Sequence, residues 1–520
     1  MLKKSETLFQ LIKSLSRNEK RYFKIYAAQL GNSEDIKYLR LFEMIDKQEE
    51  YDQDAILRQD KTLKKAQFSN LKAHLYTKIL ESLVQANSAK IPEIRIRELI
   101  NTVQVLYNKG LYYQCADNLR KAKRLAQKHD HLELMLMVSK WEKTIMQYTV
   151  GRENPIVVND VIREVKETND KINVINQLSN LSVMLNALYQ KTGYIRNEQE
   201  YGKIRDIFNR EMPDLDEEKL SINEKFQLYE LYVGYYFFIQ DFIRAYDYAS
   251  KWVELFDLYP NLIKTRVEMY IQALNSLMIA QYKLNYYSPF LITKRKLKLI
   301  RTLPIVINEN IERKLLKYTY VHEFNGYFMQ GEFTKGVALI NKVKPALENF
   351  ISTLDNHSKV ILYYKLACLY FGSSNFSESL LWLNKIFNEQ DTDLREDIHS
   401  FAKILHLISH YEIGNYEVID YYIRSTYRFL LKKEDLHEFQ LTILSFIKKL
   451  GSYIRNDELV DSFSKLLDQL KKLEQNEFES RAFIYFDIIS WLEAKLSGKN
   501  VEQIIRSKAR KRIESSAVNP

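Results

Sequence analysis

Three histidines are the closest group of residues in this chain whose types and spacing could do chemistry. His399, His406 and His410 occur in one stretch, and the last two are four residues apart, so a helix would place both on one face. Imidazoles at this spacing can hold a metal ion. Glu412 follows the group, and Phe, Leu and Ile residues surround it. We therefore expect ordinary structural histidines here, with no metal site and no other cofactor.

Short catalytic motifs are missing from the sequence. It contains no HExxH, GxSxG, GxxxxGK[ST], GxGxxG or CxxC segment. The two cysteines, Cys115 and Cys368, fall inside apolar helical patterns with no partner at metal-ligand spacing, which predicts buried, reduced thiols. We expect a protein that is not an enzyme, and a hydrolase or transferase is the least favoured class.

Basic residues are the next candidates for binding chemistry. The segment ITKRKLKLIR contains a dense run of them: Lys294, Arg295, Lys296, Lys298 and Arg301. On a helix these five side chains spread around much of the cylinder. The run is either a solvated helix face or an electrostatic patch for an acidic partner or a phosphate backbone, and its sequence alone does not separate the two. The net charge of +10, with a pI near 9.0, is a mild bias on a chain of 62.0 kDa.

The composition indicates which elements must position these residues. Only 13 Gly and 8 Pro leave little material for the tight turns of a β-rich fold, so long helices with short connections are expected. The 36 Tyr and 26 Phe residues suit the contacts between stacked helices. No apolar run approaches the ~20 residues that span a bilayer, and the segment MLKKSETLFQLIKSL lacks the apolar core of a signal peptide. These features predict a cytoplasmic location.

One sequence pattern recurs along most of the chain. Between Tyr370 and Ile386 a turn residue is followed by an aromatic, a small residue and two apolar residues at the spacing of one helix face. The successive members there are Ser374, Phe376, Ser379, Leu383 and Ile386. The same order begins at Gly110, Gly331 and Gly414. We predict that Trp382 and Leu383 lie in the core and that Gly331 has a backbone conformation reserved for glycine.

This pattern resembles the second half of a tetratricopeptide repeat. The resemblance implies an all-α fold, a right-handed α-solenoid of antiparallel helix pairs, with the first helix of each pair on the concave face. Turns are expected near Gly110, Gly151, Gly193, Asp241, Asn285, Gly331, Ser374, Gly414, Arg455 and Gly498, about 40 to 48 residues apart. That period is longer than the ~34 residues of the standard unit and predicts roughly nine or ten pairs with longer helices.

The expected first helices carry residues suited to protein recognition, because an aromatic ring has an apolar body and, in Tyr, a hydrogen-bonding tip. The candidates for contacts with a partner are Tyr229, Tyr232, Tyr318, His322, Tyr363 and Lys365. Two segments that contain Pro, GRENPIVVND (151–160) and NREMPDLDEEKLS (209–221), are expected to be loops, and one of them would hold any hinge or domain boundary.

Residues 1–90 do not show the repeat and are expected to form a separate five-helix module. Ser16 and Glu19 make a capping box for the second of these helices, which Gly31-Asn32 should stop. The module has 17 Lys and Arg against 12 Asp and Glu, about half of the net charge of the chain. The expected organisation is this module at 1–90, the solenoid at 91–513 and a disordered tail at 514–520.

Two segments of the module resemble helices of the helix-turn-helix in response-regulator output domains. LSRNEKRYFKIYA is similar to their first helix and SNLKAHLYTKILESL to their recognition helix, although more sequence separates the two here. Nucleic-acid contacts would then come from Lys65, Gln67, Asn70, Lys72 and Lys78. The alternative is a bundle that covers the first apolar face of the solenoid.

Two functions remain open. The first is a non-enzymatic scaffold or adaptor that binds a partner protein or peptide along the helical-repeat groove. The second is a transcription regulator whose residues 1–90 contact DNA while the repeats sense a partner, an architecture similar to the peptide-sensing regulators that join a helix-turn-helix to tetratricopeptide repeats. We favour the first, and expect no insertion into a membrane.

Overall fold

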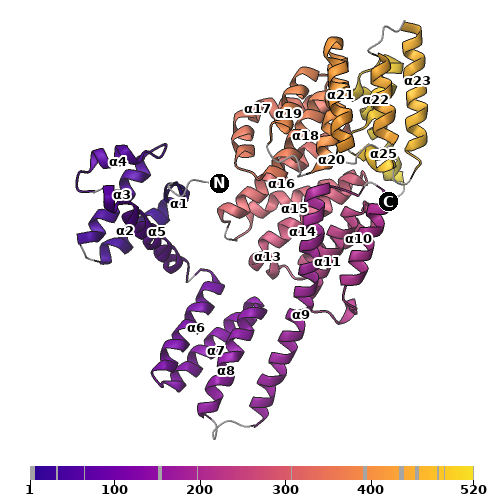
Figure 1. Cartoon of the computed structure of the whole chain (residues 1–520). Helices are drawn as coiled ribbons and strands as arrows, with labels where there is room; N and C mark the ends of the chain where they lie inside the picture. The colour runs from indigo at the N-terminus through magenta and orange to yellow at the C-terminus, as the bar shows by residue number, and fades with distance from the viewer. Residues whose placement is uncertain are drawn as a thin grey trace. The chain divides into compact units, whose positions relative to one another are not determined.

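The computed structural model describes residues 6–30, 33–63, 65–88, 90–149, 155–195, 197–305, 307–389, 395–432, 438–450, 456–476, 479–484 and 486–518. Over these ranges every regular element is a helix, as the sequence predicts (Figure 1). The chain divides into two compact units, Met1–Ile172 and Asn173–Pro520, whose boundary falls within one long helix, α9 (Pro155–Thr192).

Unit 1 begins with five helices of the amino-terminal module. They are α1 (Thr7–Ser14), α2 (Arg17–Leu30), α3 (Ser33–Lys47), α4 (Gln53–Gln59) and α5 (Lys65–Asn87). Each of the five was predicted from the sequence. The bundle has an apolar core of its own, in which Phe23, Phe42 and Phe68 are fully buried.

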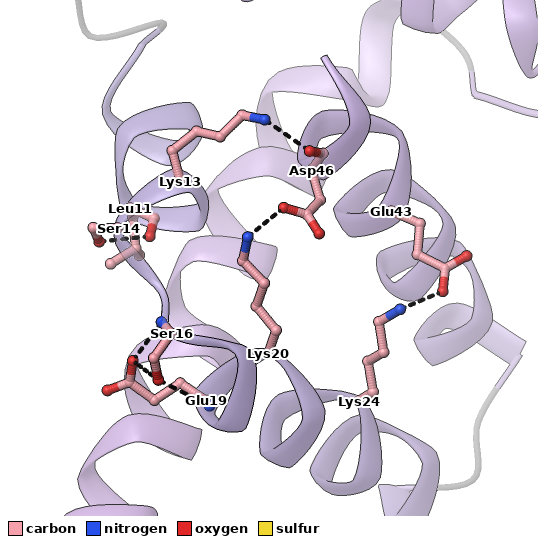
Figure 2. A network of polar contacts seen from close by, with 9 residues as sticks. All are labelled: Leu11, Lys13, Ser14, Ser16, Glu19, Lys20, Lys24, Glu43 and Asp46. Carbon is pink, nitrogen blue, oxygen red and sulfur yellow. Dashed lines mark hydrogen bonds and ion pairs between the residues drawn. The ribbon is translucent and has the colours of Figure 1, made fainter. Parts of the chain in front are cut away.

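Polar contacts fix how the helices of this bundle begin and how they are tied together (Figure 2). The capping box is confirmed, because the backbone N–H of Ser16 donates to Glu19 Oε2 at 2.8 Å and the Glu19 N–H donates to Ser16 Oγ at 3.3 Å. Lys20 pairs with Asp46 at 2.7 Å and Lys24 pairs with Glu43 at 2.8 Å, so lysines of α2 meet carboxylates of α3. Part of the positive charge of this module is therefore neutralised inside the module.

Three further helices of unit 1 form a second small core. They are α6 (Pro92–Asn108), α7 (Tyr112–His129) and α8 (Leu132–Thr149). Cys115 lies in the core of this group, buried beside Ile96, Leu99 and Val103. The predicted turn at Gly110 joins α6 to α7 with φ +72°, the left-handed conformation that glycine adopts at no steric cost.

Unit 2 contains the second half of α9 and the remaining helices. Its first group is α10 (Glu198–Glu211), η1 (Glu217–Lys219), α11 (Ile222–Phe238), α12 (Phe242–Leu258), α13 (Asn261–Thr265), α14 (Val267–Lys283), α15 (Tyr287–Leu299) and η2 (Ile300–Thr302). The next group is α16 (Glu309–Gln330), α17 (Phe333–Ser352), α18 (Asn356–Gly372), α19 (Phe376–Phe387), α20 (Glu396–Glu412) and α21 (Tyr416–Lys432). The last is α22 (Glu438–Leu450), α23 (Asn456–Leu473), η3 (Glu479–Ile484), α24 (Ile488–Ser497) and α25 (Val501–Val518).

Helices of unit 2 pack in sequential pairs. α11 packs on α12, α14 on α15, α16 on α17, α18 on α19 and α20 on α21. The first helix of a pair also packs on the first helix of the next, as α14 does on α16 and α18 on α20. This is the packing of a helical-repeat arrangement, in which each unit contacts its neighbours along the chain. We call α11, α14, α16, α18 and α20 the first helices of these pairs.

The predicted turns between paired helices share one backbone geometry. Gly331 has φ +62°, and the N–H groups of Gly331 and Glu332 donate to the carbonyls of Phe328 and Tyr327, which is a Schellman motif. Ser374 (φ +62°), Asn285 (φ +56°) and Gly414 (φ +77°) take the same left-handed position. At the predicted Asp241 turn the residue with positive φ is Gln240.

The core prediction is also confirmed. Trp382 and Leu383 of α19 are buried in the larger apolar cluster of unit 2. That cluster includes Tyr370, Leu369 and Phe371 from α18. In this pair, apolar positions of the sequence pattern therefore lie in the core, where α19 packs on α18.

Two long-range contacts were not predicted. The backbone N–H of Arg395, just before α20, donates to the carbonyl of Gln190 near the end of α9 at 3.0 Å. α25 packs on α16, and the side chain of Thr334 donates to the Glu502 carboxylate. Segments about 170 to 200 residues apart in sequence are thus joined within unit 2.

One loop prediction was wrong. Residues 155–160 of the segment GRENPIVVND belong to α9, which begins at Pro155. Proline is favoured at the first position of a helix, because its ring presets φ and that position needs no N–H donor. Residues 151–154, the Gly31-Asn32 stop and the predicted turns at Gly151 and Arg455 lie outside the described residues. Among the described helices, none is both long and apolar enough to cross a membrane.

Candidate binding cavity

A cavity of about 1130 Å³ lies within unit 2. Most of the residues that line it come from α9, from the first helices α11, α14, α16 and α18, from the turn before α20, and from the segment that runs from α23 to α25. This volume is slightly larger than the ~300 to 1,000 Å³ typical of small-ligand sites. Successive first helices therefore contribute neighbouring parts of one concave surface, which we call the inner cavity.

Positive charge is concentrated in the part of the inner cavity lined by residues 182–398. Four cationic side chains line this part, Lys283, Lys317, Lys365 and Arg395, and Glu230 is the one carboxylate among the described residues that line it. In the part lined by residues 471–512 the charges balance, because the lining has three cations (Lys471, Lys508 and Arg512) and three carboxylates (Glu474, Asp487 and Glu493). Lys471 and Lys508 pair with Glu493 at 3.5 and 2.9 Å. The excess of cations therefore belongs to the first part.

Aromatic rings separate these cations. The ammonium of Lys365 lies 5.1 Å and that of Lys283 5.6 Å from the centroid of the Tyr282 ring. Lys283 also lies 5.5 Å from the ring of Tyr194, and the Arg395 guanidinium lies 5.9 Å from the same ring. The ring faces attract the cations through their quadrupoles and so help to position them.

Arg395 is linked to His357 of α18 through a third ring, that of Tyr189. Its guanidinium lies 5.2 Å from the ring of Tyr189, which is 6.3 Å from the imidazole of His357. Arg395 donates to both carboxylate oxygens of Asp397, at 2.8 and 2.6 Å, and both residues are buried. A buried pair with this bidentate geometry satisfies the charge of Arg395 and fixes its position.

A polar network lies behind Lys365. Lys365 Nζ donates to Asn325 Oδ1 at 2.7 Å, Asn325 Nδ2 is 3.2 Å from His322 Nδ1, and His322 Nε2 is 3.0 Å from Asn275 Oδ1. The four residues come from α18, α16 and α14, so the network crosses three consecutive first helices. Burial and the charge of Lys365 lower the pKa of His322 to about 3, so the ring is neutral and can accept from one neighbour and donate to the other.

Burial also affects the lysines themselves. It lowers the pKa of Lys283 to about 7, and the charges of Lys365 and Arg395 add to this effect, while Asp397 opposes it. The pKa of Lys365 falls to about 8 for the same main reason. The pKa of Lys317 is lowered by burial too, and its ammonium donates to Ser358 Oγ at 3.0 Å. Burial therefore disfavours the charged form of all three lysines.

The predicted partner-binding residues divide into two groups. Tyr318 and Lys365 line the inner cavity, and His322 is buried one hydrogen-bond partner behind Lys365. The described lining does not include Tyr229, Tyr232 or Tyr363. Tyr229 donates to Glu217, Tyr232 stacks on Tyr248 and Tyr363 packs on Trp382, so these three support the fold around it.

Sequence reasoning missed Lys283, Lys317, Arg395 and His357. A signal for Lys283 was present, since it is a lone cation at the end of the apolar segment SLMIAQYK, much as Lys365 interrupts YYKLACLYF. A search of the sequence for charged residues within the apolar first helices would have identified both lysines. Arg395 has no such signal, because only the contact with Gln190 and Asp397 brings it to the cavity.

The basic run at 294–301 forms ion pairs with neighbouring helices. Lys294 and Lys298 both pair with Glu323 of α16, at 2.7 and 2.9 Å. Lys296 pairs with Asp257 of α12 at 2.7 Å, and Arg301 with Glu312 at 2.8 Å. Arg295 is exposed. Most of these basic side chains therefore form ion pairs that link α15 and η2 to neighbouring helices, and they are not an unpaired surface patch.

The candidates for nucleic-acid contacts on α5 are also divided. Lys65, Gln67 and Asn70 are exposed, but Lys72 donates to Tyr51 and Gln53, each at 3.2 Å, and Lys78 pairs with Glu81 at 2.8 Å. Farther along α5 the exposed side chains are apolar: Tyr76, Leu80 and Val84. This surface presents fewer unpaired cations than the sequence suggests.

The histidines and cysteines that the structure describes do not form a metal site or a reactive thiol site. No group of three or more His, Cys, Asp or Glu residues there could hold a metal ion. His406 and His410 pack against Tyr422 with centroid distances of 4.7 Å, as buried structural histidines do. Burial raises the pKa of Cys368 to about 12, which keeps it in the unreactive thiol form.

No model of a protein family matches this chain, and no curated protein matches it in sequence.

Proposed function

We propose that this protein is a non-enzymatic scaffold or adaptor of the tetratricopeptide-like class, which binds a segment of a partner protein or a peptide in the inner cavity. The observation that carries the proposal is the lining of one large concave surface by successive first helices. Such a surface suits an extended or helical segment, which can contact several helices in turn.

The chemistry of the lining supports a binding role. Tyr189, Tyr282, Tyr318 and Phe328 offer apolar area, and Asn275 and Asn325 carry amide groups that can both donate and accept hydrogen bonds. Aromatic side chains are enriched at sites of protein recognition. The link from a helical-repeat surface to binding is an analogy at the level of the fold.

Photo-crosslinking in the native cells tests this function. A photoreactive phenylalanine analogue placed at Val321 or Ile361, which line the inner cavity, should crosslink to a defined segment of one partner, identified by mass spectrometry. The same analogue at Lys342, an exposed position on α17, is the control. Crosslinks of equal yield from both surfaces, or none from the cavity, would contradict the proposal.

A further inference from the structure

One wall of the inner cavity is formed by the single helix α25. The residues of this helix that line the cavity are Val501, Ile505, Lys508 and Arg512. They are four, three and four residues apart, so they share one face of the helix over three turns. Gln503, Ser507 and Arg510, on the opposite face, are exposed. This wall is therefore one helix thick, whereas the first helices α11, α14, α16 and α18 are backed by the second helices of their pairs.

Polar contacts hold α25 in this position. The backbone N–H of Thr334, at the start of α17, donates to the Glu502 carboxylate at 3.2 Å, and the Thr334 hydroxyl donates to the same carboxylate. Arg506 pairs with Glu502 at 2.6 Å within α25. On the other side, Lys508 pairs with Glu493 of α24 at 2.9 Å. We call the contact between Thr334 and Glu502 the clasp, because it joins α25 to the start of α17.

Apolar packing adds little to this attachment. Between residues 501 and 512 the buried apolar side chains of α25 are Val501 and Ala509, and its two isoleucines there are only half-buried. On α18, by contrast, Leu366, Leu369 and Phe371 are all fully buried. Segments with few buried apolar contacts open at a lower free-energy cost than the core of the same protein. We therefore expect α25 to open more readily than the first helices.

The connection from α24 to α25 has the features of a hinge. Residues 498–500 are exposed, and Gly498 has φ +67° with no atom within 4 Å of the place that a β-carbon would occupy. The start of α25 is capped within its own first turn. Asn500 Oδ1 accepts from the N–H of Gln503 at 2.8 Å, and Gln503 Oε1 accepts from the N–H of Asn500 at 3.1 Å. The helix can therefore turn about residues 498–500 without losing its own cap.

The clasp lies close to the part of the inner cavity that contains Cys368. Phe333, the residue before Thr334, lines the cavity, and a β-carbon at Gly372 of α18 would overlap its ring. Cys368 is one helical turn before Gly372, lines the same cavity and is 9% exposed. The reactivity of this thiol can therefore report whether the wall beside the clasp is open.

We propose that α25 is a lid of the inner cavity, which opens by release of the clasp and rotation about residues 498–500 and so admits a partner segment to the surface near Phe333 and Cys368. In the closed state, apolar side chains of α25 line the cavity. In the open state, apolar side chains of the partner segment can take their place. The admission of a partner rests on the proposed function, whereas the opening is a property of this chain alone.

The rate at which N-ethylmaleimide modifies Cys368 in the full chain tests the lid. Mass spectrometry measures this rate, and Cys115, buried in unit 1, is the internal reference. Thr334→Val removes the hydroxyl of the clasp at an exposed position. We expect Cys368 to react about tenfold faster in this variant, because the reagent reaches the thiol in the open state; a tenfold change in that population corresponds to about 1.4 kcal/mol. The rate at Cys115 should not change.

Two further variants make the test specific. Glu502→Gln keeps the shape of the side chain but removes its charge, and should also accelerate the reaction of Cys368. Thr353→Val is the matched control, because the Thr353 hydroxyl donates to the carbonyl of Phe350 at the other end of α17. Circular dichroism and thermal melting establish that each variant is folded. Unchanged rates at Cys368 in both clasp variants, or an equal acceleration in Thr353→Val, would overturn the lid.

The crosslinking experiment judges the proposed function separately. A partner crosslinked in the cavity, together with Cys368 rates that do not respond to the clasp variants, would leave the function standing and end this inference. Faster reaction of Cys368 in the clasp variants, with no crosslinked partner, would support the lid and contradict the function.

Discussion

Lys283 is a residue whose pKa departs far from the value that its type would suggest. Its ammonium lies against the rings of Tyr194, Phe242 and Tyr282 near Lys365, Arg395 and Asp397, and its pKa falls from 10.5 to about 7. The sequence shows a cation at the end of an apolar helix, but not that the helix ends inside a cavity. Its role in the site therefore depends on the tertiary structure.

The depressed pKa predicts how stability depends on pH. In the unfolded chain Lys283 binds its proton up to about pH 10.5, whereas in the folded chain it releases the proton above about pH 7. Between these values the unfolded state binds more protons, so the free energy of unfolding should rise with pH. Denaturant unfolding of the ligand-free protein between about pH 7 and 9 should show this rise, and Lys283→Met should reduce it. A slope unchanged by the substitution would mean that the lysine is solvated.

Leu383 tests the core at the same scale. Its side chain is 0% exposed, whereas Leu381 on the same helix is 56% exposed. Leu383→Ala should lower the free energy of unfolding by roughly 2 to 5 kcal/mol, because it leaves a cavity between α18, α19 and α20. Leu381→Ala, the matched control, should change it by less than about 0.5 kcal/mol. Similar losses in urea titrations of the two variants would show that α19 packs with a different face.

At the scale of elements, the turn at Gly331 does more than join α16 to α17. A β-carbon there would lie 2.5 Å from the backbone nitrogen of Arg506, so α25 packs directly on the turn. Gly414 has a similar positive φ, but a β-carbon there would meet only the edge of the Tyr416 ring, at 3.9 Å. The two glycines therefore separate backbone strain from the contact with α25.

Substitution of these glycines should have unequal effects. Gly414→Ala should cost about 1 kcal/mol, the strain of a left-handed residue with a side chain. Gly331→Ala should cost more, since the backbone of α25 must also move, and hydrogen exchange of α25 should increase in that variant alone. Equal losses of melting temperature, with α25 equally protected in both, would argue against the packing of α25 on this turn.

The amino-terminal bundle provides the test of the other function considered. Nucleic-acid binding depends on cations that meet phosphates, and on α5 the exposed candidates are Lys65, Gln67 and Asn70. We expect the full chain to give no salt-sensitive shift of duplex DNA at micromolar concentration. A shift that weakens with salt and is lost on Lys65→Glu would contradict this expectation. Lys72 is unsuitable for the test, because its contact with Tyr51 would be lost as well.

Elements were predictable where a local signal determines them. The Ser16–Glu19 capping box set the start of α2, and the glycines of the Schellman turns set the ends of α6 and α16. Pro155 misled the prediction, because the same residue can begin a helix or interrupt one and only the following residues decide which. Within the cavity, Tyr318 and Lys365 were predictable from their place on first helices.

At the scale of the whole molecule, two contacts between distant segments of unit 2 could not be predicted from the sequence. The start of α20 meets the end of α9 through Arg395, Gln190 and Asp397, and α25 returns to α16 and α17. No sequence period requires either contact, because each joins segments that are far apart in the chain. The first of them brings Arg395 to the inner cavity, so the cationic lining of the cavity is complete only in the folded unit.

Obstructing the inner cavity without disturbing the fold tests most directly whether a partner segment binds there. Val183 lines the cavity on α9 and is 66% exposed, while Ile243 on α12 lies outside the described lining and is 64% exposed. Calorimetric titration with the crosslinked partner segment should give one site per chain in the wild type. Val183→Trp should weaken it at least about tenfold, and Ile243→Trp should leave it unchanged. Unaltered affinity in the Val183→Trp protein, or an equal loss in both, would contradict binding in the inner cavity.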